Sequence, residues 1–561
     1  MRVLGINSVF HDPAAALVID GRVVAAAEEE RFSRRKHGKR PVPFSAWEQP
    51  AAAARWCLRF ADISPGEVDM IAFSYDPGLA RPAGDMGLND PWDELRTIYA
   101  AQAPRFLAEA LPGLDPSRAR FVPHHVAHAA SAALAAPAGG CSVLVSDGRG
   151  EQDSFLAGRY RGGRLEVFGT QRLPHSLGLL YESLTEHLGF LRSSDEYKVM
   201  ALASYGKPRF LDQIREKVPL GDLGFQTLAV DWAELAPARA PGEDWTAAHA
   251  DLAASVQRRL EEVLLALAGQ VHDRTGDSAL AMAGGTALNC VANTVIASEG
   301  PFPTVWVQPA AGDAGTALGA ALQLAAARGE PGWSMTGADL GRGFTDSQVE
   351  AALAAARVAF ERPADIAEAA AEVLAADGVV AWFQGRSEYG PRALGQRSLL
   401  AHPGRRANLT RLNDVKGRES FRPVAPIVQA GRAPEIFRRG PLPSPYMLFV
   451  HDVAAAWQDR IPAVVHVDGT ARVQTVDPAA QPLLARLLTA FERRTGLPVL
   501  VNTSLNTAGR PMVDDIRDAL ECFGSTPVDL LAIGPFAIRR PWSAAQGPAA
   551  HASAAARPAA R

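Results

Sequence analysis

Three histidines lie within five residues, at His124, His125 and His128, in an alanine-rich stretch that follows Pro123. Proline suits the start of a helix and alanine its interior, so we expect a helix here. On a helix, His124 and His128 stand at i and i+4, and both rings leave one face about one turn apart. This spacing suits two ligands of one metal ion. Core or capping roles would explain an isolated pair as well, and His125 could also pair with His128.

Two helical histidines cannot complete a metal site, so carboxylates must come from elsewhere in the chain. The apolar run 141–146 predicts a buried strand that ends at Asp147, and the strand 304–307 leads to Asp313 at a strand-to-helix turn. Carboxylates at such turns are typical of metal or phosphate sites. We therefore predict a two-nitrogen, two-oxygen site for Fe(II), Mn(II) or Zn(II), made of His124, His128, Asp147 and Asp313.

The first 27 residues predict three short strands, with His11 and Asp12 in the polar turn between the first two. Actin, sugar kinases and heat-shock ATPases begin in this way, and there the turn faces phosphate groups. The region 141–170 repeats the strand–turn–strand pattern, so we expect an internally duplicated domain. An ordinary β-hairpin would show the same local pattern.

Residues 28–39 carry three acids and then six basic or histidine side chains. A solvated charged loop would explain them, but beside the first turn Lys36 could reach a phosphate or an acceptor hydroxyl. The segment 76–97 is rich in turns and prolines, and we predict an insertion that forms a lid over the site.

Paired glycines, Gly284 and Gly285, stand at a predicted strand-to-helix turn, followed by Asn289. Glycines there would let a nucleotide approach the backbone and the helix N-terminus, and Gly312 lies in the next such turn. A lone Gly-Gly pair is usually only a turn.

A second domain is predicted after a loosely patterned region at 345–362. Between Arg386 and Arg422 there are nine basic side chains and three acids, in a chain of net charge −4. This excess predicts an anionic ligand. Nucleic acid is one candidate, but interleaved glycines and prolines favour a shaped pocket with forked donors for a triphosphate. A solvated basic face is the plain alternative. A predicted hairpin at 464–474 adds Arg472.

Length and composition bound the class of protein. A chain of 561 residues implies more than one domain. Net charge of −4 and a pI near 6.4 argue against a nucleic-acid or membrane surface. Four scattered cysteines fit a reduced, cytoplasmic protein. We expect no signal peptide, no membrane span and a disordered tail at 544–561.

Taken together, the motifs resemble the ATP-dependent O-carbamoyltransferases of antibiotic and nodulation-factor biosynthesis, over about residues 1–543. The most specific segments are FHDPAAALVIDG at 10–21, EEERFSRRKHG at 28–38, EYKVMALASYG at 196–206, GRSEYGPRALGQRS at 385–398, LNDVKGRESFRPVAP at 412–426 and LVNTSLNT at 500–507.

The resemblance implies an α/β fold of two domains. Residues 1–350 would form an actin-like duplicated transfer domain, similar to the tRNA threonylcarbamoyl-transfer enzymes, with iron at the four-residue site and adenosine at Gly284, Gly285, Asn289 and Gly312. Residues 363–543 would form a YrdC-like domain that binds ATP, Mg(II) and carbamoyl phosphate. Its implied ligands are Arg386, Arg392, Lys416, Arg418, Arg422, Arg472, Asn502 and Ser504.

The implied reaction makes carbamoyl-adenylate from carbamoyl phosphate and ATP, and transfers the carbamoyl group to a natural-product hydroxyl. An antibiotic sugar or macrocycle of aminoglycoside, macrolide or ansamycin type is the expected acceptor. His11 is the candidate general base, Asp12 the alternative, and Lys36 would stabilise charge. A tRNA-modifying fusion and an actin-like kinase or ATPase are competing functions. The acceptor, the metal and a homo-oligomeric state stay open.

Overall fold

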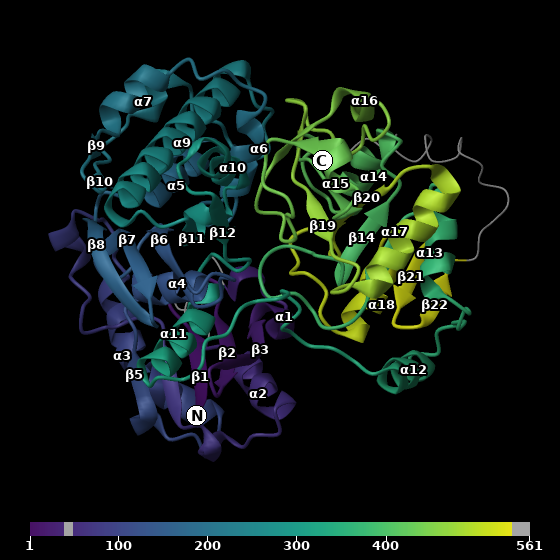
Figure 1. The fold of residues 1–561 in the computed structure, drawn as a ribbon, viewed down its shortest axis with the longest axis horizontal. Helices are drawn as coiled ribbons and strands as arrows, with labels where there is room; N and C mark the ends of the chain where they lie inside the picture. Colours follow the sequence, from purple (N-terminus) through teal and green to yellow (C-terminus); the bar gives the residue numbers. More distant parts are fainter. Residues whose placement is uncertain (39–48, 541–561) are drawn as a thin grey trace, which may run out of the picture.

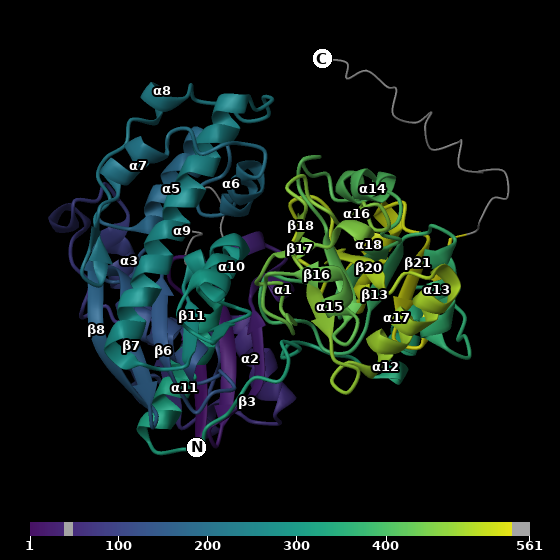
Figure 2. The same ribbon diagram turned by 45° about the horizontal axis from the view of Figure 1, so that its top comes forward.

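The computed structural model describes residues 1–38 and 49–540, so the tail predicted at 544–561 lies outside the described residues. The chain forms two lobes that lie side by side in Figures 1 and 2. The N-terminal lobe contains two five-stranded sheets, and the C-terminal lobe is built around a seven-stranded sheet. The mixed α/β class predicted from the sequence is confirmed.

The first sheet of the N-terminal lobe runs in the order β3-β2-β1-β4-β5. Its first three strands in the chain are antiparallel neighbours, and β4 and β5 then add in parallel. Short turns join the antiparallel strands, whereas the parallel strands need helical connections. The strands are β1 (Arg2–Asn7), β2 (Ala14–Ile19), β3 (Arg22–Glu28), β4 (Met70–Phe73) and β5 (Ala119–Phe121).

The second sheet repeats this topology strand for strand, in the order β8-β7-β6-β11-β12. An antiparallel meander is again followed by two parallel strands. The predicted internal duplication is therefore confirmed. The strands are β6 (Gly140–Ser146), β7 (Asp153–Arg161), β8 (Arg164–Arg172), β11 (Ala279–Ala283) and β12 (Thr304–Val307).

Helices α4 (His124–Ala133) and α11 (Ala314–Ala327) pack together between the two sheets (Figure 1). Glycines allow very close contact here. A Cβ on Gly319 would lie 1.9 Å from the Ala127 carbonyl oxygen, and one on Gly5 would lie 1.9 Å from the Ala317 carbonyl oxygen. Asp313 begins α11, so this packing fixes its carboxylate beside the histidines of α4.

The long helix α9 (Ala247–Thr275) packs beside the second sheet and contributes ten buried residues to the surrounding apolar core. The other helices of the lobe are α1 (Glu30–Ser33), α2 (Ala51–Phe60), α3 (Asp93–Ala110), α5 (Leu177–His187), α6 (Glu196–Ala203), α7 (Leu211–Lys217), α8 (Trp232–Leu235) and α10 (Cys290–Glu299). Two short strands, β9 (Leu220–Gly221) and β10 (Gly224–Phe225), pair beside them.

The C-terminal sheet runs in the order β19-β15-β20-β14-β13-β21-β22. Its strands are β13 (Val380–Phe383), β14 (Arg397–Ala401), β15 (Ala425–Gln429), β19 (Gln474–Val476), β20 (Val499–Ser504), β21 (Leu530–Ile533) and β22 (Phe536–Arg539). The helices of this lobe are α12 (Asp346–Ala355), α13 (Ile366–Ala375), α14 (Ala407–Val415), α15 (Ala433–Ile436), α16 (Ala455–Gln458), α17 (Pro482–Thr495) and α18 (Ile516–Ser525).

Two expectations for this lobe differ from the structure. The loosely patterned region 345–362 contains α12, whose Val349 and Leu353 are buried in the C-terminal core. The hairpin predicted at 464–474 is wrong, because residues 464–467 form no strand and the strands after the turn join different sheets: β18 (Thr470–Ala471) pairs with β17 (His451–Val453), and β19 pairs with β15. A third short strand, β16 (Phe437–Arg438), completes the small sheet.

Within the described ranges, no helix has the length and apolarity that crossing a lipid bilayer requires.

Candidate active site

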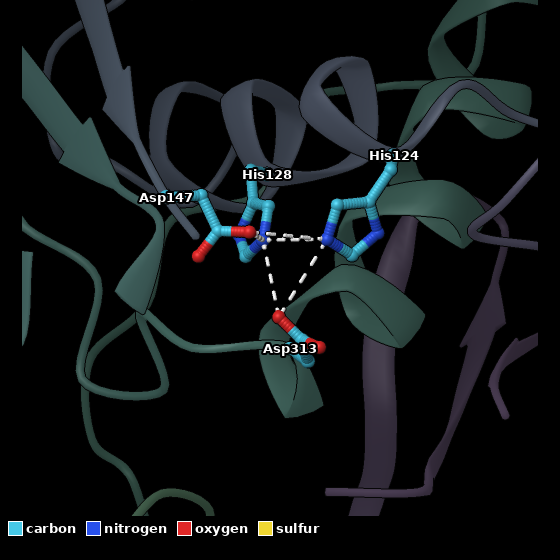
Figure 3. A group of neighbouring side chains, drawn as sticks. All are labelled: His124, His128, Asp147 and Asp313. Atoms are coloured by element: carbon cyan, nitrogen blue, oxygen red, sulfur yellow. Dashed lines mark hydrogen bonds and ion pairs between the residues drawn. The ribbon is translucent and has the colours of Figure 1, made fainter. Parts of the chain in front are cut away.

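The four side chains predicted as metal ligands converge in the N-terminal lobe (Figure 3). Their nearest nitrogen and oxygen atoms lie 3.2 to 3.7 Å apart. Two atoms bound to one tetrahedral ion at about 2.1 Å would be about 3.4 Å apart, so these separations suit a shared cation. All four residues are buried, and the donor set of two imidazoles and two carboxylates suits Fe(II), Mn(II) or Zn(II).

Neighbouring groups orient each of these ligands. The His124 Nδ1–H donates to the Ser74 carbonyl at 3.0 Å, which turns Nε2 toward the other three residues. The Gly285 N–H donates to Asp147 Oδ1 at 2.8 Å and leaves Oδ2 facing the histidines. Such outer hydrogen bonds hold metal ligands in one orientation. The Glu151 carboxylate accepts from the His124 backbone N–H at 2.8 Å, a contact that the sequence did not reveal.

The charges of this set depend strongly on one another. Burial alone would lower the pKa of His124, but hydrogen bonds with Asp147 and Asp313 raise it well above its usual value. Burial alone would raise the pKa of both carboxyls, but the histidines lower it. The carboxylates thus stabilise positive charge at the centre, and a metal ion would supply that charge in place of a proton.

His125 does not join this set. Its ring lies 5.6 Å from the His124 ring and 6.3 Å from the His128 ring, centroid to centroid. It packs instead against Gly150, where a Cβ would come within 2.7 Å of the imidazole. Burial and the neighbouring histidines lower the pKa of His125 to about 3, so it is a neutral packing residue. Of the two pairings that the sequence left open, the structure therefore supports His124 with His128 and not His125 with His128.

The first turn places His11 and Asp12 next to His37, which the sequence had not singled out. Asp12 Oδ2 lies 2.8 Å from His11 Nδ1, and Asp12 Oδ1 lies 2.7 Å from His37 Nδ1. The Asn7 side-chain amide holds this turn by donating to the carbonyls of His11 and Asp12 at 2.8 and 3.0 Å. In the sequence, the only signal that His37 belongs to the site is its position directly after Lys36 in the EEERFSRRKHG segment.

Phe10 connects this turn to the four-residue set, because its ring lies edge-on to the His124 ring at 5.6 Å. The Arg149 guanidinium covers the same phenyl ring at 5.1 Å and bonds Asp90 and Asp93, each at 2.7 Å. The end of the segment predicted as a lid is therefore held against the turn that carries Asp147. Whether it opens and closes stays a prediction.

The glycines predicted to hold a nucleotide make close contacts within the protein. Gly284 has φ 92°, and a Cβ there would lie 2.2 Å from the Ser146 carbonyl oxygen. Only glycine fits this approach of the turn to the end of β6. Asn289 caps α10, and its side-chain amide bonds Gln257. Gly312 lies near Leu288 in the adjoining turn. Nucleotide binding by these residues stays a prediction.

In the C-terminal lobe, part of the predicted basic set gathers into one cluster, which we call the basic pocket. It consists of Arg392, Lys416, Arg418, Arg422 and Arg472. Burial and the like charges of neighbours lower the pKa of Arg392 and of Arg418 to about 9 and lower that of Lys416. In the described chain, only Arg422 of this cluster has a carboxylate partner, Glu419 at 3.5 Å.

Several N–H groups of the basic pocket are buried without a partner in the part of the chain that the structure describes. They are Arg392 Nε, Arg418 Nη2 and Arg472 Nε. Buried polar groups are normally hydrogen-bonded, so unpartnered donors on like-charged side chains indicate an anionic ligand. Lys416 lies beside Ser504 at 2.9 Å, as the predicted set requires. The Asn502 amide donates instead to the Ala393 carbonyl and to Gln474.

Arg386 does not lie with the basic pocket. Its Nε donates to the Gly341 carbonyl at 2.9 Å, and its guanidinium stacks on the Phe60 ring at 4.3 Å. Its donors are used in connecting the two lobes, so the structure gives no support to the prediction that Arg386 binds ATP or carbamoyl phosphate.

Helices α6 and α10 of the N-terminal lobe face the C-terminal lobe (Figure 2). The Tyr197 ring, on α6, lies 4.5 Å from the Arg422 guanidinium and 5.9 Å from the Lys36 ammonium. Beside it, Lys198 pairs with Glu419 at 2.7 Å across the lobes. Tyr197 therefore lies between the basic pocket and the segment that carries His37. In the sequence, the only indication that Tyr197 belongs to the site is that it lies in the EYKVMALASYG motif.

Comparisons with known proteins agree with this architecture. The family described as Carbamoyltransferase N-terminus matches residues 2–322, and that described as Carbamoyltransferase C-terminus matches residues 371–540. An uncharacterized protein of Synechocystis is 36% identical over 96% of both chains. Nodulation protein NolNO of Sinorhizobium fredii is 36% identical over 95% of this chain and 80% of its own.

Among solved structures, a ROK hexokinase from Thermus thermophilus matches 58% of this chain and 98% of its own, with 18% identity and a TM-score of 0.27. A likeness this distant supports no functional statement. The two family matches and the near full-length relatives do, and the chain therefore belongs to the carbamoyltransferase family and is a carbamoyltransferase.

Proposed function

We propose that this enzyme makes carbamoyl-adenylate from carbamoyl phosphate and ATP in the basic pocket. It then transfers the carbamoyl group to a hydroxyl of a natural product beside the four-residue His/Asp set. The basic pocket carries this proposal, because a kinase or ATPase with an actin-like fold alone would leave it without a purpose. In this proposal the second domain is YrdC-like.

The first half-reaction needs an environment that tolerates concentrated negative charge. Water first hydrolyses carbamoyl phosphate, so that phosphate leaves and carbamate remains, and a carbamate oxygen then attacks the α-phosphorus of ATP. The bond from the α-phosphorus to the bridging oxygen breaks, and pyrophosphate leaves. Forked guanidinium groups such as Arg392 and Arg418 stabilise the charge that develops on the phosphoryl oxygens. Their unpartnered N–H groups are already buried and need no release from another partner.

The second half-reaction needs a proton acceptor close to the acceptor hydroxyl. The hydroxyl oxygen bonds the carbamoyl carbon, the bond to the adenylate oxygen breaks, and AMP leaves. His11 takes the hydroxyl proton, with its Nδ1 held by Asp12, and Lys36 stabilises the charge of the leaving phosphate. A divalent ion held by the four-residue set would polarise the carbamoyl group and stabilise negative charge.

Contacts between the two lobes would give the adenylate a short path from the first reaction site to the second. Tyr197 contacts the Arg422 and Lys36 cations, so the adenylate would pass from one basic group to the next without leaving the protein. Exclusion of water along such a path would limit hydrolysis of the activated carbamoyl group.

Product analysis tests the proposal directly. Purified enzyme is incubated with ATP and carbamoyl phosphate, first alone and then with a panel of aminoglycosides, macrolides and ansamycins. We expect pyrophosphate and AMP without ADP, and a carbamoylated product with at least one acceptor. Formation of ADP would instead indicate a kinase or an ATPase.

A further inference from the structure

One cluster of titratable side chains lies outside the four-residue set: His11, Asp12 and His37. Both contacts of the Asp12 carboxylate, at 2.7 and 2.8 Å, are shorter than the separation of about 3.4 Å expected of two ligands on a tetrahedral ion. They have the length of charge-assisted hydrogen bonds. The three residues therefore form a carboxylate shared by two imidazoles, and not a second metal site.

The ionisation of Asp12 agrees with this arrangement. Burial alone would raise its pKa, but His11 and His37 together lower it well below the usual value. A carboxylate only accepts hydrogen bonds, so each ring carries a proton on Nδ1 where it meets Asp12. His37 Nε2 is buried and has no hydrogen-bond partner in the described part of the chain.

The backbone of His37 supports a specific role for this ring. His37 has φ 58°, in the left-handed region that few residues other than glycine adopt, although histidine, asparagine and aspartate are enriched there. The Glu30 carboxylate holds this conformation by accepting from the His37 N–H at 2.8 Å. A residue held in such a conformation is more common at functional sites than elsewhere.

We infer that His37 is a positioning residue that shares the Asp12 carboxylate with His11, and thereby sets the orientation and the proton affinity of the His11 ring. The catalytic consequence rests on the proposed function, in which His11 accepts the hydroxyl proton. With both of its oxygens bound, the Asp12 carboxylate cannot turn. Without His37, one oxygen loses its partner, and the carboxylate can rotate away from the geometry that aims His11.

Because His37 also binds the Asp12 carboxylate, less of the negative charge of that carboxylate acts on His11. A hydrogen bond from His37 withdraws part of the Asp12 charge, so removal of His37 leaves more of that charge to stabilise a His11 imidazolium. His11 should then keep its proton to higher pH. Among the described residues, charged groups near the two rings include Glu30, which binds the His37 backbone, Glu196, whose charge acts on His11, and Lys36, which precedes His37 in the chain. All of these stay in place when the His37 ring is removed.

Two variants of the full-length protein test the inference. His37→Gly removes the ring and accepts φ 58° without strain, and His37→Asn also tolerates this conformation and restores a neutral donor to Asp12. Protonation of His11 is followed by NMR of ¹⁵N-labelled histidine rings, with His11→Gln to assign the signal. We expect the His11 titration midpoint to move to higher pH in His37→Gly and to return toward the wild-type midpoint in His37→Asn.

A rate measurement adds a second readout. With synthetic carbamoyl-adenylate as substrate and water as the probe acceptor, AMP release at pH 7 should fall on the order of 10-fold in His37→Gly, and by less at pH 9. The acidic limb of the pH profile should move to higher pH in parallel with the His11 titration.

The outcomes separate the inference from the function on which it rests. An unchanged His11 titration in both variants would overturn the positioning role. A moved titration, combined with AMP release in His11→Gln at the wild-type rate, supports the positioning role and instead removes His11 from the base role.

Discussion

The four-residue His/Asp set and the basic pocket both bury charged side chains, but they differ in how those charges are balanced. In the first, carboxylates and imidazoles converge at 3.2 to 3.7 Å, and their mutual pKa shifts stabilise positive charge at the centre. In the second, cations gather around Arg392 with a single acidic partner in the described residues, and the pKa values of Arg392 and Arg418 fall. Buried charge of either kind is costly without a partner.

The comparison predicts ligands of opposite charge for the two sites. A cation would complete the His/Asp set, and an anion would complete the basic pocket. The Tyr197 ring contacts both Arg422 and Lys36, which supports our proposal that the two sites act on one substrate in sequence.

The largest effect should come from the metal ligands. The His124→Ala/His128→Ala double variant should lose its bound metal and its acceptor transfer, since two carboxylates alone make a poor site for such an ion. Pyrophosphate release should persist. Metal content is measured by elemental analysis, and His125→Ala is the matched control that should keep the metal. Stoichiometric metal in the double variant would mean that another site binds it.

The next largest effect should come from the basic pocket. Arg422→Ala or Arg392→Ala should slow carbamoyl phosphate-dependent ATP–pyrophosphate exchange on the order of 10³-fold, because a guanidinium on the transferring phosphoryl group is removed. Arg406→Ala, an exposed arginine of the same basic segment, should exchange normally. Normal exchange in both pocket variants would remove the adenylation step from this pocket.

Loss of the proposed base should have a smaller effect and only on transfer. His11→Ala should lower acceptor transfer by about 10²–10⁴-fold, with metal content and pyrophosphate release unchanged. Asp12→Asn should lower it less, because Asp12 orients His11 and does not touch the acceptor in our account. If Asp12→Asn proves the more damaging change, the roles of the two residues must be exchanged.

The smallest effect should come from the ion pair across the lobes. Both Lys198 and Glu419 keep some exposure to solvent, so Lys198→Ala should cost about 1 kcal/mol of stability or less. It should release somewhat more AMP per carbamoylated product, because the lobes separate more easily. Arg105→Ala breaks an exposed pair within one helix and is the control that should change neither quantity.

Much of the N-terminal lobe could be predicted from the sequence, because its signals are local. Strand ends followed by Asp147 and Asp313, and histidines at helical spacing, indicate where each ligand lies along the chain. Their convergence is found, but it depends on packing that one sequence does not show, such as the contact of Gly319 with Ala127. Metal binding itself stays a prediction.

The C-terminal lobe was harder to predict, because its contacts join distant segments. The segment 464–474 looks like one hairpin in sequence, yet residues 464–467 form no strand, and β18 and β19 pair with different neighbours. Arg386 looks like its basic neighbours, but it binds carbonyls between the lobes. His37 and Tyr197 were missed for the same reason, since their partners lie on other elements.

The most direct test of the account is to supply its proposed intermediate. Synthetic carbamoyl-adenylate and an acceptor found by the screen are given to Arg422→Ala and to the His124→Ala/His128→Ala variant. We predict that Arg422→Ala recovers carbamoyl transfer at close to the wild-type rate, and that the histidine variant does not. If Arg422→Ala remains inactive with carbamoyl-adenylate, or if the histidine variant uses it, the division into an anion site and a cation site is contradicted.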